Sequence, residues 1–194
     1  MIDQRLRPHL HGILEPIGRT LVKVGFTPTV MTVLGLVVAI CGSVVIGFGQ
    51  LFWGGLIALG GSAIDGLDGS VARASNRVTT RGAYLDSIFD RIGEISILTG
   101  LAVSQRTDAR ILLLCLLCLG GALLIPYIRA KAETLGIDGK GGMLGRAERV
   151  ILATVGAMTG FVEPMLWVFL VVAWFTVGQR FMGTYQAIPP GSGD

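Results

Sequence analysis

The sequence predicts an all-α integral membrane protein, with six transmembrane helices and an amphipathic interfacial helix at its N-terminal end. Three observations lead to this prediction. Of the 194 residues, 52% are hydrophobic and only 15% are charged, whereas soluble domains carry about 25% charged residues. Several apolar stretches approach the roughly 20 residues that a helix needs to cross a bilayer. The basic residues gather in alternate connections between these stretches.

The six predicted spans form one membrane domain, 26–184, after a juxtamembrane helix (1–25) and before a flexible tail (185–194). In chain order the spans are Thr29–Phe48, Leu51–Ala72, Ala83–Val103, Ile111–Ala130, Val150–Phe161 and Pro164–Phe181. A tight turn, Val162–Glu163–Pro164, is expected between the last two. No cleavable signal is evident at the N-terminus, so these spans must direct insertion.

The Lys and Arg residues predict the orientation. On one side of the predicted bundle they are Arg5, Arg7, Arg19, Lys23, Arg73, Arg77, Arg81, Lys131, Lys140, Arg146, Arg149 and Arg180. The opposite connections contain only Arg106 and Arg110. Because basic loops stay in the cytoplasm, we expect a multi-pass protein of the cell membrane with both termini cytoplasmic. No nucleic-acid partner is expected.

The segment Gln4–Val24 is amphipathic. Its apolar residues recur every three or four positions, at Leu6, Leu10, Ile13, Leu14, Ile17, Leu21 and Val24. This pattern predicts a helix lying in the cytoplasmic interface, started or bent by Pro8 and Pro16. His9 and His11 are expected to lie at headgroup level rather than to bind metal.

Four aspartates stand where the second predicted span ends and the third begins. Asp65 and Asp68 are three residues apart, and Asp86 and Asp90 are four apart. Both spacings place two side chains on one face of a helix. The connection Ala74–Gly82 is short, so the two helices should be antiparallel neighbours whose acidic ends face each other.

Carboxylates gathered in this way repel one another unless cations neutralise them or some are protonated. Hard oxygen ligands without Cys or His indicate Mg²⁺, Mn²⁺ or Ca²⁺. Four carboxylates are enough for two ions, an arrangement that supports phosphoryl transfer. The alternative is a structural charge network with Arg73, Arg77, Arg81 and Arg91. Intramembrane carboxylates seldom accumulate without a function, which favours the metal site.

The stretch 65–90 resembles the signature of the CDP-alcohol phosphotransferase family, D-x2-D-G-x2-A-R-x8-G-x3-D-x3-D. Every fixed position matches: Asp65, Asp68, Gly69, Ala72, Arg73, Gly82, Asp86 and Asp90. The resemblance implies six membrane helices around a cavity open to the cytoplasm, usually in a homodimer.

Further roles are implied by the same resemblance. Asp65, Asp68 and Asp86 would bind two Mg²⁺ ions, with Mn²⁺ as an alternative, and Asp86 would bridge them. Asp90 would contact the second ion and act as the catalytic base that deprotonates the acceptor hydroxyl, which attacks the phosphorus directly as CMP leaves. The donor CDP-diacylglycerol would be bound by Thr29, Val30, Met31, Thr32, Asp65, Gly69, Arg73 and Thr79.

The acceptor is indicated by a different part of the chain. The pattern Y-I-R-A-K-A-E, followed by G-G and R-x-E-R, resembles the bacterial phosphatidylinositol phosphate synthases, and the likeness covers most of the sequence. It implies a myo-inositol phosphate acceptor whose phosphate is bound by Arg129, Lys131 and Arg149. Pro126 stands where a small hydroxyl residue is expected.

Alternatives remain at this level. Glycerol 3-phosphate also carries a phosphate and would fit the same basic residues. Anchoring of the chain at the membrane surface is the alternative role of these basic residues. A divalent-cation transporter is the remote alternative. A transporter would spread its acidic residues through the membrane depth, whereas here they cluster at one end, beside Gly69 and Arg73.

Overall fold

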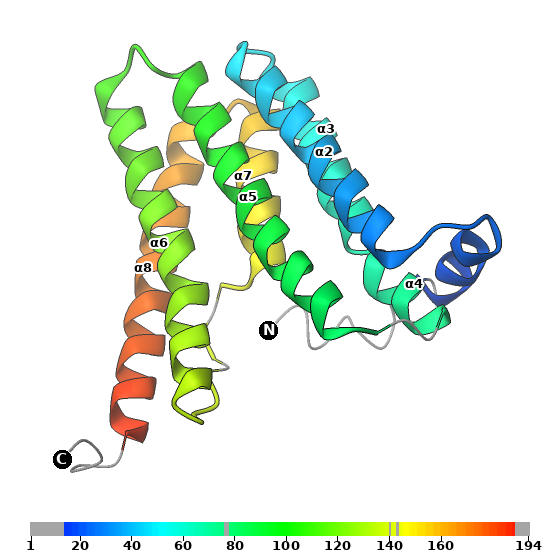
Figure 1. Cartoon of the computed structure of the whole chain (residues 1–194). Coiled ribbons are helices and arrows are strands. Elements are labelled where there is room, and N and C mark those ends of the chain that lie inside the picture. The colour runs from blue at the N-terminus through cyan, green and yellow to red at the C-terminus, as the bar shows by residue number, and fades with distance from the viewer. Residues whose placement is uncertain (1–13, 76–77, 140, 143, 189–194) are drawn as a thin grey trace.

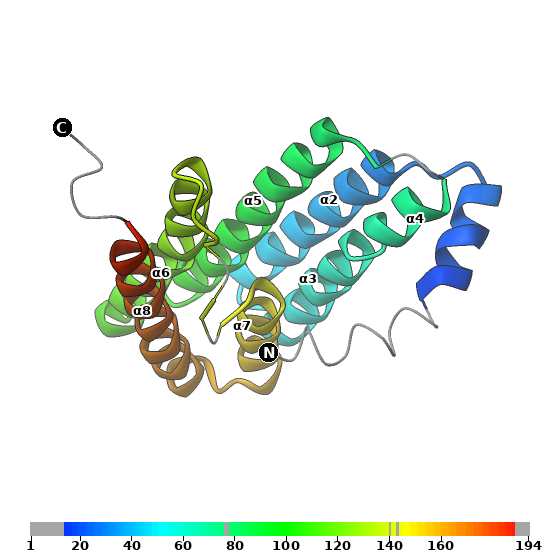
Figure 2. The same cartoon turned by 90° about the horizontal axis from the view of Figure 1, so that it is seen from below.

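The protein is described by a computed structural model covering residues 14–75, 78–139, 141–142 and 144–188. These residues form helices and no strand, so the all-α class is confirmed. The helices are α2 (Pro28–Gly47), α3 (Leu51–Asp65), α4 (Asp68–Ala74), α5 (Thr80–Ser104), α6 (Ala109–Thr134), α7 (Arg146–Thr159) and α8 (Val162–Ala187). Two groups stand side by side, α2 with α3 and α5, and α6 with α8, and α7 lies between them (Figures 1 and 2).

Among the described helices, α2, α6 and α8 are long and apolar enough to cross a membrane. At 25 residues, α5 is also long, about 37 Å at the helical rise, but its first half carries charged residues. The helices α3 and α7 have only 15 and 14 residues. The prediction of six spans is therefore supported in part: each predicted span has a helix, and three helices meet the criteria for a span.

The predicted second span is two helices, and its prediction as one helix was wrong. The chain turns after Asp65 at residues 66–67 and resumes as α4 at Asp68. Two glycines alternate with the acids here, and a glycine inside a helix costs about 1 kcal/mol relative to alanine. Asp65 and Asp68 therefore belong to different helices. Both α3 and α5 pack mainly against α2, rather than directly on each other as predicted.

The connection before the last helix also differs from the prediction. The expected turn Val162–Glu163–Pro164 is instead the first turn of α8, where the N–H that proline lacks would have had no helical partner. Gly160 makes the reversal, with a left-handed φ of 76° that glycine adopts readily.

The last two predicted spans were also too short at their other ends, because α7 begins at Arg146 and α8 continues to Ala187. Residues 185–187 of the predicted tail are thus helical, and 189–194 lie outside the described residues.

A helix over residues 14–23 precedes α2 and lies beside α4 in Figure 2. Gly18 packs so closely on α4 that a Cβ there would be 2.8 Å from the carbonyl carbon of Ser70. The rest of the predicted amphipathic helix, with His9 and His11, lies outside the described residues. Its location in the membrane interface stays a prediction.

The close packing of α2 on α3 positions the acidic site. Gly42 faces Gly54 and Gly35 faces Gly61, and a Cβ on Gly54 or Gly61 would lie 2.7 Å from the opposing glycine's carbonyl oxygen. Small residues allow membrane helices to approach in this way. Gly35 also lies directly against Asp65, where an added Cβ would be 2.7 Å from the Asp65 Cβ. The backbone contact therefore fixes where Asp65 stands.

Candidate active site

Three carboxylates meet at one end of this helix group. Asp65 ends α3, Asp68 begins α4 and Asp86 lies in the second turn of α5. One oxygen from each lies within 4.8 Å of the others. Asp65 is buried, and the other two are partly buried. The fold thus brings together three of the four predicted metal ligands.

The chemistry of this triad fits a hard divalent cation. Its ligand atoms are carboxylate oxygens, which Mg²⁺ and Mn²⁺ prefer. The buried Oδ1 atom of Asp65 accepts no hydrogen bond from the described residues, so its lone pairs are available to a ligand. Three carboxylates this close together repel one another, and a divalent cation would relieve that repulsion.

Asp90 lies next to the triad but is joined to it through an arginine. The Nη1 atom of Arg146 is 2.8 Å from Asp65 Oδ2 and 2.7 Å from Asp90 Oδ1. Arg91 reaches the other Asp90 oxygen at 3.6 Å. Burial lowers the pKa of Arg146, but Asp90, Asp65 and Asp86 raise it more, so the net pKa is raised and the side chain stays charged.

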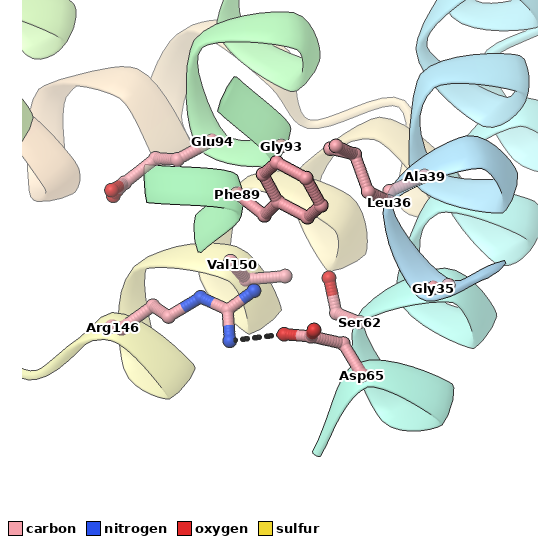
Figure 3. A pocket seen from close by; sticks show the side chains of 11 residues that line it. Gly35, Leu36, Ala39, Ser62, Asp65, Phe89, Gly93, Glu94, Arg146 and Val150 are labelled. Atoms are coloured by element: carbon pink, nitrogen blue, oxygen red, sulfur yellow. Dashed lines mark ion pairs between the residues drawn. The ribbon is translucent and has the colours of Figure 1, made fainter. Parts of the chain in front are cut away.

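A small cavity lies beside this ion pair, between α2, α3, α5 and α7 (Figure 3). In the figure, Arg146 and Asp65 point toward each other, and the carboxylate of Glu94 points away from both. The cavity volume is about 10 Å³, which is room for about one water molecule. A nucleotide cannot fit there, so the substrates must reach the carboxylates from another side.

The residues predicted to contact the donor occupy different environments. Thr32 is buried and donates hydrogen bonds to Asp68 Oδ2 and to Pro28 O, both at 3.0 Å. Thr79 is exposed, and its Oγ1 accepts a hydrogen bond from Gly82 N at 3.0 Å, which caps α5.

The other predicted donor contacts lie at the ends of α2 and α4. Thr29 and Val30 are exposed at the start of α2, and Met31 is buried. In α4, Gly69 lies against Arg73, with its Cβ position 3.4 Å from the arginine Nη1. Contacts between α2 and α4 bring this group beside the triad.

The predicted acceptor residues are not equivalent. Arg149 is only 2% exposed. It donates from Nε and Nη2 to the carboxylate of Glu94 and from Nη1 to Leu144 O. Arg129 and Lys131 are exposed at the end of α6, where Arg129 pairs with Glu133 at 2.9 Å. Arg149 is therefore committed to a partner within the protein.

Two arginines that the sequence did not assign to the acceptor join this region. Arg180 of α8 donates to Gly141 O at 2.8 Å and to Ile125 O at 2.9 Å, and it interacts electrostatically with Arg91, Arg129 and Arg149. These four residues, Arg91 of α5, Arg129 of α6, Arg149 of α7 and Arg180 of α8, are called the arginine cluster below. Arg180 falls within a predicted span, and an ionisable residue at such a position is itself a functional signal.

A carboxylate triad able to hold a metal ion, beside an arginine cluster and among long apolar helices, is the arrangement expected of a membrane enzyme that acts on phosphate esters. The chain belongs to the CDP-alcohol phosphatidyltransferase family, whose sequence model matches residues 26–179. The all-helical fold and the enzyme class predicted from the sequence are thereby confirmed.

Named relatives agree with this assignment. The chain is 30% identical to the archaetidylinositol phosphate synthase of Pyrococcus horikoshii over 177 residues, which is 91% of this chain and 93% of that protein. It is 36% identical to the phosphatidylinositol phosphate synthase of Mycobacterium tuberculosis over 149 residues, 75% of this chain and 69% of that protein.

Solved structures of the Mycobacterium tuberculosis enzyme have the same fold. The structure with CDP-DAG bound gives a TM-score of 0.84 at 32% sequence identity, covering 94% of this chain and 97% of that chain. The structure in complex with manganese and citrate also gives 0.84, at 31% identity, covering 93% and 92% of the two chains.

Proposed function

We propose that this enzyme transfers the phosphatidyl group of CDP-diacylglycerol to a myo-inositol phosphate, forming phosphatidylinositol phosphate and releasing CMP. The bacterial and archaeal relatives share inositol phosphate in their names and differ in the lipid. A structural neighbour at 32% identity binds CDP-DAG. The observation in this chain that supports a phosphorylated acceptor is the arginine cluster beside the carboxylates, since a neutral alcohol would not need it. The choice of inositol phosphate rests on the named relatives.

The carboxylates divide the chemical roles in this proposal. Asp65, Asp68 and Asp86 hold two Mg²⁺ ions, with Mn²⁺ as an alternative. When bound, the ions neutralise charge on the diphosphate and stabilise the departing CMP. Asp90 takes the proton of the acceptor hydroxyl, and its position one turn after Asp86 on α5, beside the triad, supports this role.

The donor is bound along the start of α2 and along α4. The nucleotide is contacted from the first turn of α2, by Thr29, Val30 and Met31. Thr32 acts on donor binding by orienting Asp68 through its hydrogen bond. Gly69 allows close approach of the diphosphate, Arg73 pairs with it, and Thr79 offers its hydroxyl proton while its oxygen caps α5.

The acceptor phosphate is bound by the accessible members of the basic region. These are Arg129 and Lys131 of α6, together with Arg180 of α8. Arg149 contributes indirectly, because its donors already contact Glu94 and Leu144. This differs from the sequence expectation, in which Arg149 touches the phosphate.

The surrounding arrangement is part of the proposal. We infer a single membrane domain of six helices and an interfacial N-terminal helix, working as a homodimer, with the active site and both termini on the cytoplasmic side. The distribution of basic residues supports the orientation. The three apolar helices support the membrane location.

The proposed function is tested with purified protein, CDP-diacylglycerol and Mg²⁺. Inositol phosphate, glycerol 3-phosphate, inositol and serine are offered separately, and CMP release is measured. We expect CMP with inositol phosphate. CMP release with glycerol 3-phosphate alone would make the enzyme a phosphatidylglycerol phosphate synthase, and release with none of the four would overturn the proposal.

A further inference from the structure

Glu94 has no role in the function described so far. It lies on α5, one turn after Asp90, and is only 4% exposed. Its carboxylate accepts hydrogen bonds from Nε and Nη2 of Arg149, the latter at 3.1 Å, and from Nη1 of Arg91, also at 3.1 Å. A buried carboxylate with these partners is fully committed to two arginines of the cluster.

The same contacts connect the arginine cluster to the reacting end. Arg91 also lies 3.6 Å from Asp90, and Arg146, one turn before Arg149 on α7, lies 2.7 Å from Asp90. The helices α5 and α7 therefore meet at two levels, Asp90 with Arg146 and Glu94 with Arg149. Four residues along a helix separate the levels by about 6 Å.

We propose that Glu94 is a positioning residue for the phosphorylated acceptor. It holds Arg91 and Arg149 in a fixed register with Asp90. Both arginines interact electrostatically with Arg180, which binds the acceptor's phosphate in the proposed function. Through them, the distance from this phosphate site to Asp90, which takes the hydroxyl proton, is set by the protein. The acceptor's hydroxyl must reach Asp90 while its phosphate reaches the basic residues. A fixed distance between these two sites therefore selects acceptors by the separation of their hydroxyl and phosphate groups. The inference rests on the proposed function in that it needs a phosphorylated acceptor.

The sign of one substitution separates positioning from simple charge. Glu94→Gln removes a negative charge beside the arginines, so electrostatics alone predicts tighter binding of the acceptor phosphate. Positioning predicts the opposite. Arg149 loses a buried counter-charge and reorients, and Arg91 loses the bond that holds it between Glu94 and Asp90.

The experiment measures KM for inositol phosphate and for CDP-diacylglycerol in wild type and Glu94→Gln. We expect KM for inositol phosphate to rise about tenfold or more, as for loss of a charged hydrogen-bond partner, with KM for the donor within about twofold. The matched control is Glu163→Gln, which removes the same charge from an interhelical pair with Arg110 at the other end of α8. It should leave both constants unchanged.

A double-mutant cycle with Arg149→Gln tests the route. If Glu94 acts through Arg149, the two substitutions together raise KM for inositol phosphate by less than the product of their separate effects. Glu94→Asp keeps the charge and should raise KM for inositol phosphate less than Glu94→Gln does. If Glu94→Gln does not fold, Glu94→Asp takes its place in the comparison of the two KM values. The inference would be overturned if Glu94→Gln lowered KM for inositol phosphate or left it unchanged. It would also be overturned if KM for inositol phosphate and KM for CDP-diacylglycerol rose equally.

Failure of the proposed function would be visible separately. If wild type uses glycerol 3-phosphate instead of inositol phosphate, the function is wrong and Glu94 is judged by KM for glycerol 3-phosphate. If wild type uses no phosphorylated acceptor, the function and the inference both fail.

Discussion

Two side chains outside the triad hold two of its three carboxylates in place. Thr32 donates a hydrogen bond to Asp68 Oδ2 at 3.0 Å, and Arg146 contacts Asp65 and Asp90. Each of these contacts joins different helices, so Asp65 and Asp68 are oriented by tertiary structure as well as by their own helices. A metal site held in this way binds its ion with less rearrangement than one built from mobile side chains.

Thr32→Val tests this orientation. The substitution preserves the shape of the side chain and removes the hydrogen bond to Asp68, worth about 1.5–3 kcal/mol when the acceptor is charged. We expect the Mg²⁺ concentration for half-maximal CMP release to rise about tenfold. Thr159→Val is the control, because that hydroxyl bonds only to carbonyls of its own helix. Equal Mg²⁺ requirements in the two variants would show that Thr32 does not support the metal site.

The aspartates could be predicted from sequence, and the arginine contacts could not. Asp86 and Asp90 share one helix, as their spacing predicts, and Asp65 and Asp68 stay close across the short break between α3 and α4. Arginine has a long side chain that selects its partner among several helices, so Arg146 reaches Asp65 and Arg149 reaches Glu94 only once α7 is packed. The phosphate contact expected for Arg149 stays a prediction, and its contact with the buried Glu94 is a feature that the sequence did not indicate.

At the scale of elements, α2 is the helix on which the acidic end is assembled. Both α3 and α5 pack against it. On the α3 side the contact is between backbones, with Gly42 against Gly54 and Gly35 against Gly61. Because Asp65 lies at the end of this interface, the separation of α2 and α3 affects the site directly.

Neighbouring glycines of α3 give a matched test of this packing. Gly61→Ala places a Cβ 2.7 Å from Gly35 O, whereas Gly60→Ala meets nothing within 4 Å. We expect Gly61→Ala to lower the stability by about 1–3 kcal/mol and to reduce activity by displacing Asp65. Gly60→Ala should be neutral or stabilising by roughly 0.5–1 kcal/mol. Thermal unfolding of the purified variants in detergent measures both, and similar melting temperatures would contradict the account of the interface.

The positions of the helices could be predicted from hydropathy, but their ends could not. An apolar run of suitable length marks a helix, and each predicted span has one. The break between α3 and α4 falls at Gly66 and Leu67, which keep right-handed helical dihedral angles, and the start of α8 at Val162 follows Gly160, which adopts a left-handed conformation. Hydropathy does not record either effect.

For the whole molecule, the proposed topology has the carboxylates and the arginine cluster on the cytoplasmic face. Thr107 lies between α5 and α6, and Thr134 ends α6 on the opposite side; both are exposed. In a Cys41→Ser background, Thr107→Cys should react with a membrane-impermeant maleimide in intact cells. Thr134→Cys should react only after permeabilisation. The reverse pattern would invert the proposed topology.

The central claim is that the Asp65, Asp68 and Asp86 triad performs metal-dependent phosphatidyl transfer to inositol phosphate. The most direct measurement follows conversion of CDP-diacylglycerol to phosphatidylinositol phosphate and CMP by wild type and Asp86→Asn, with Mg²⁺ or with EDTA. We predict that wild type forms both products with Mg²⁺, and only when inositol phosphate is present. Nearly all activity should be lost in EDTA or on substitution of Asp86. Product formation that persists in EDTA, or in folded Asp86→Asn at the wild-type rate, would contradict the account.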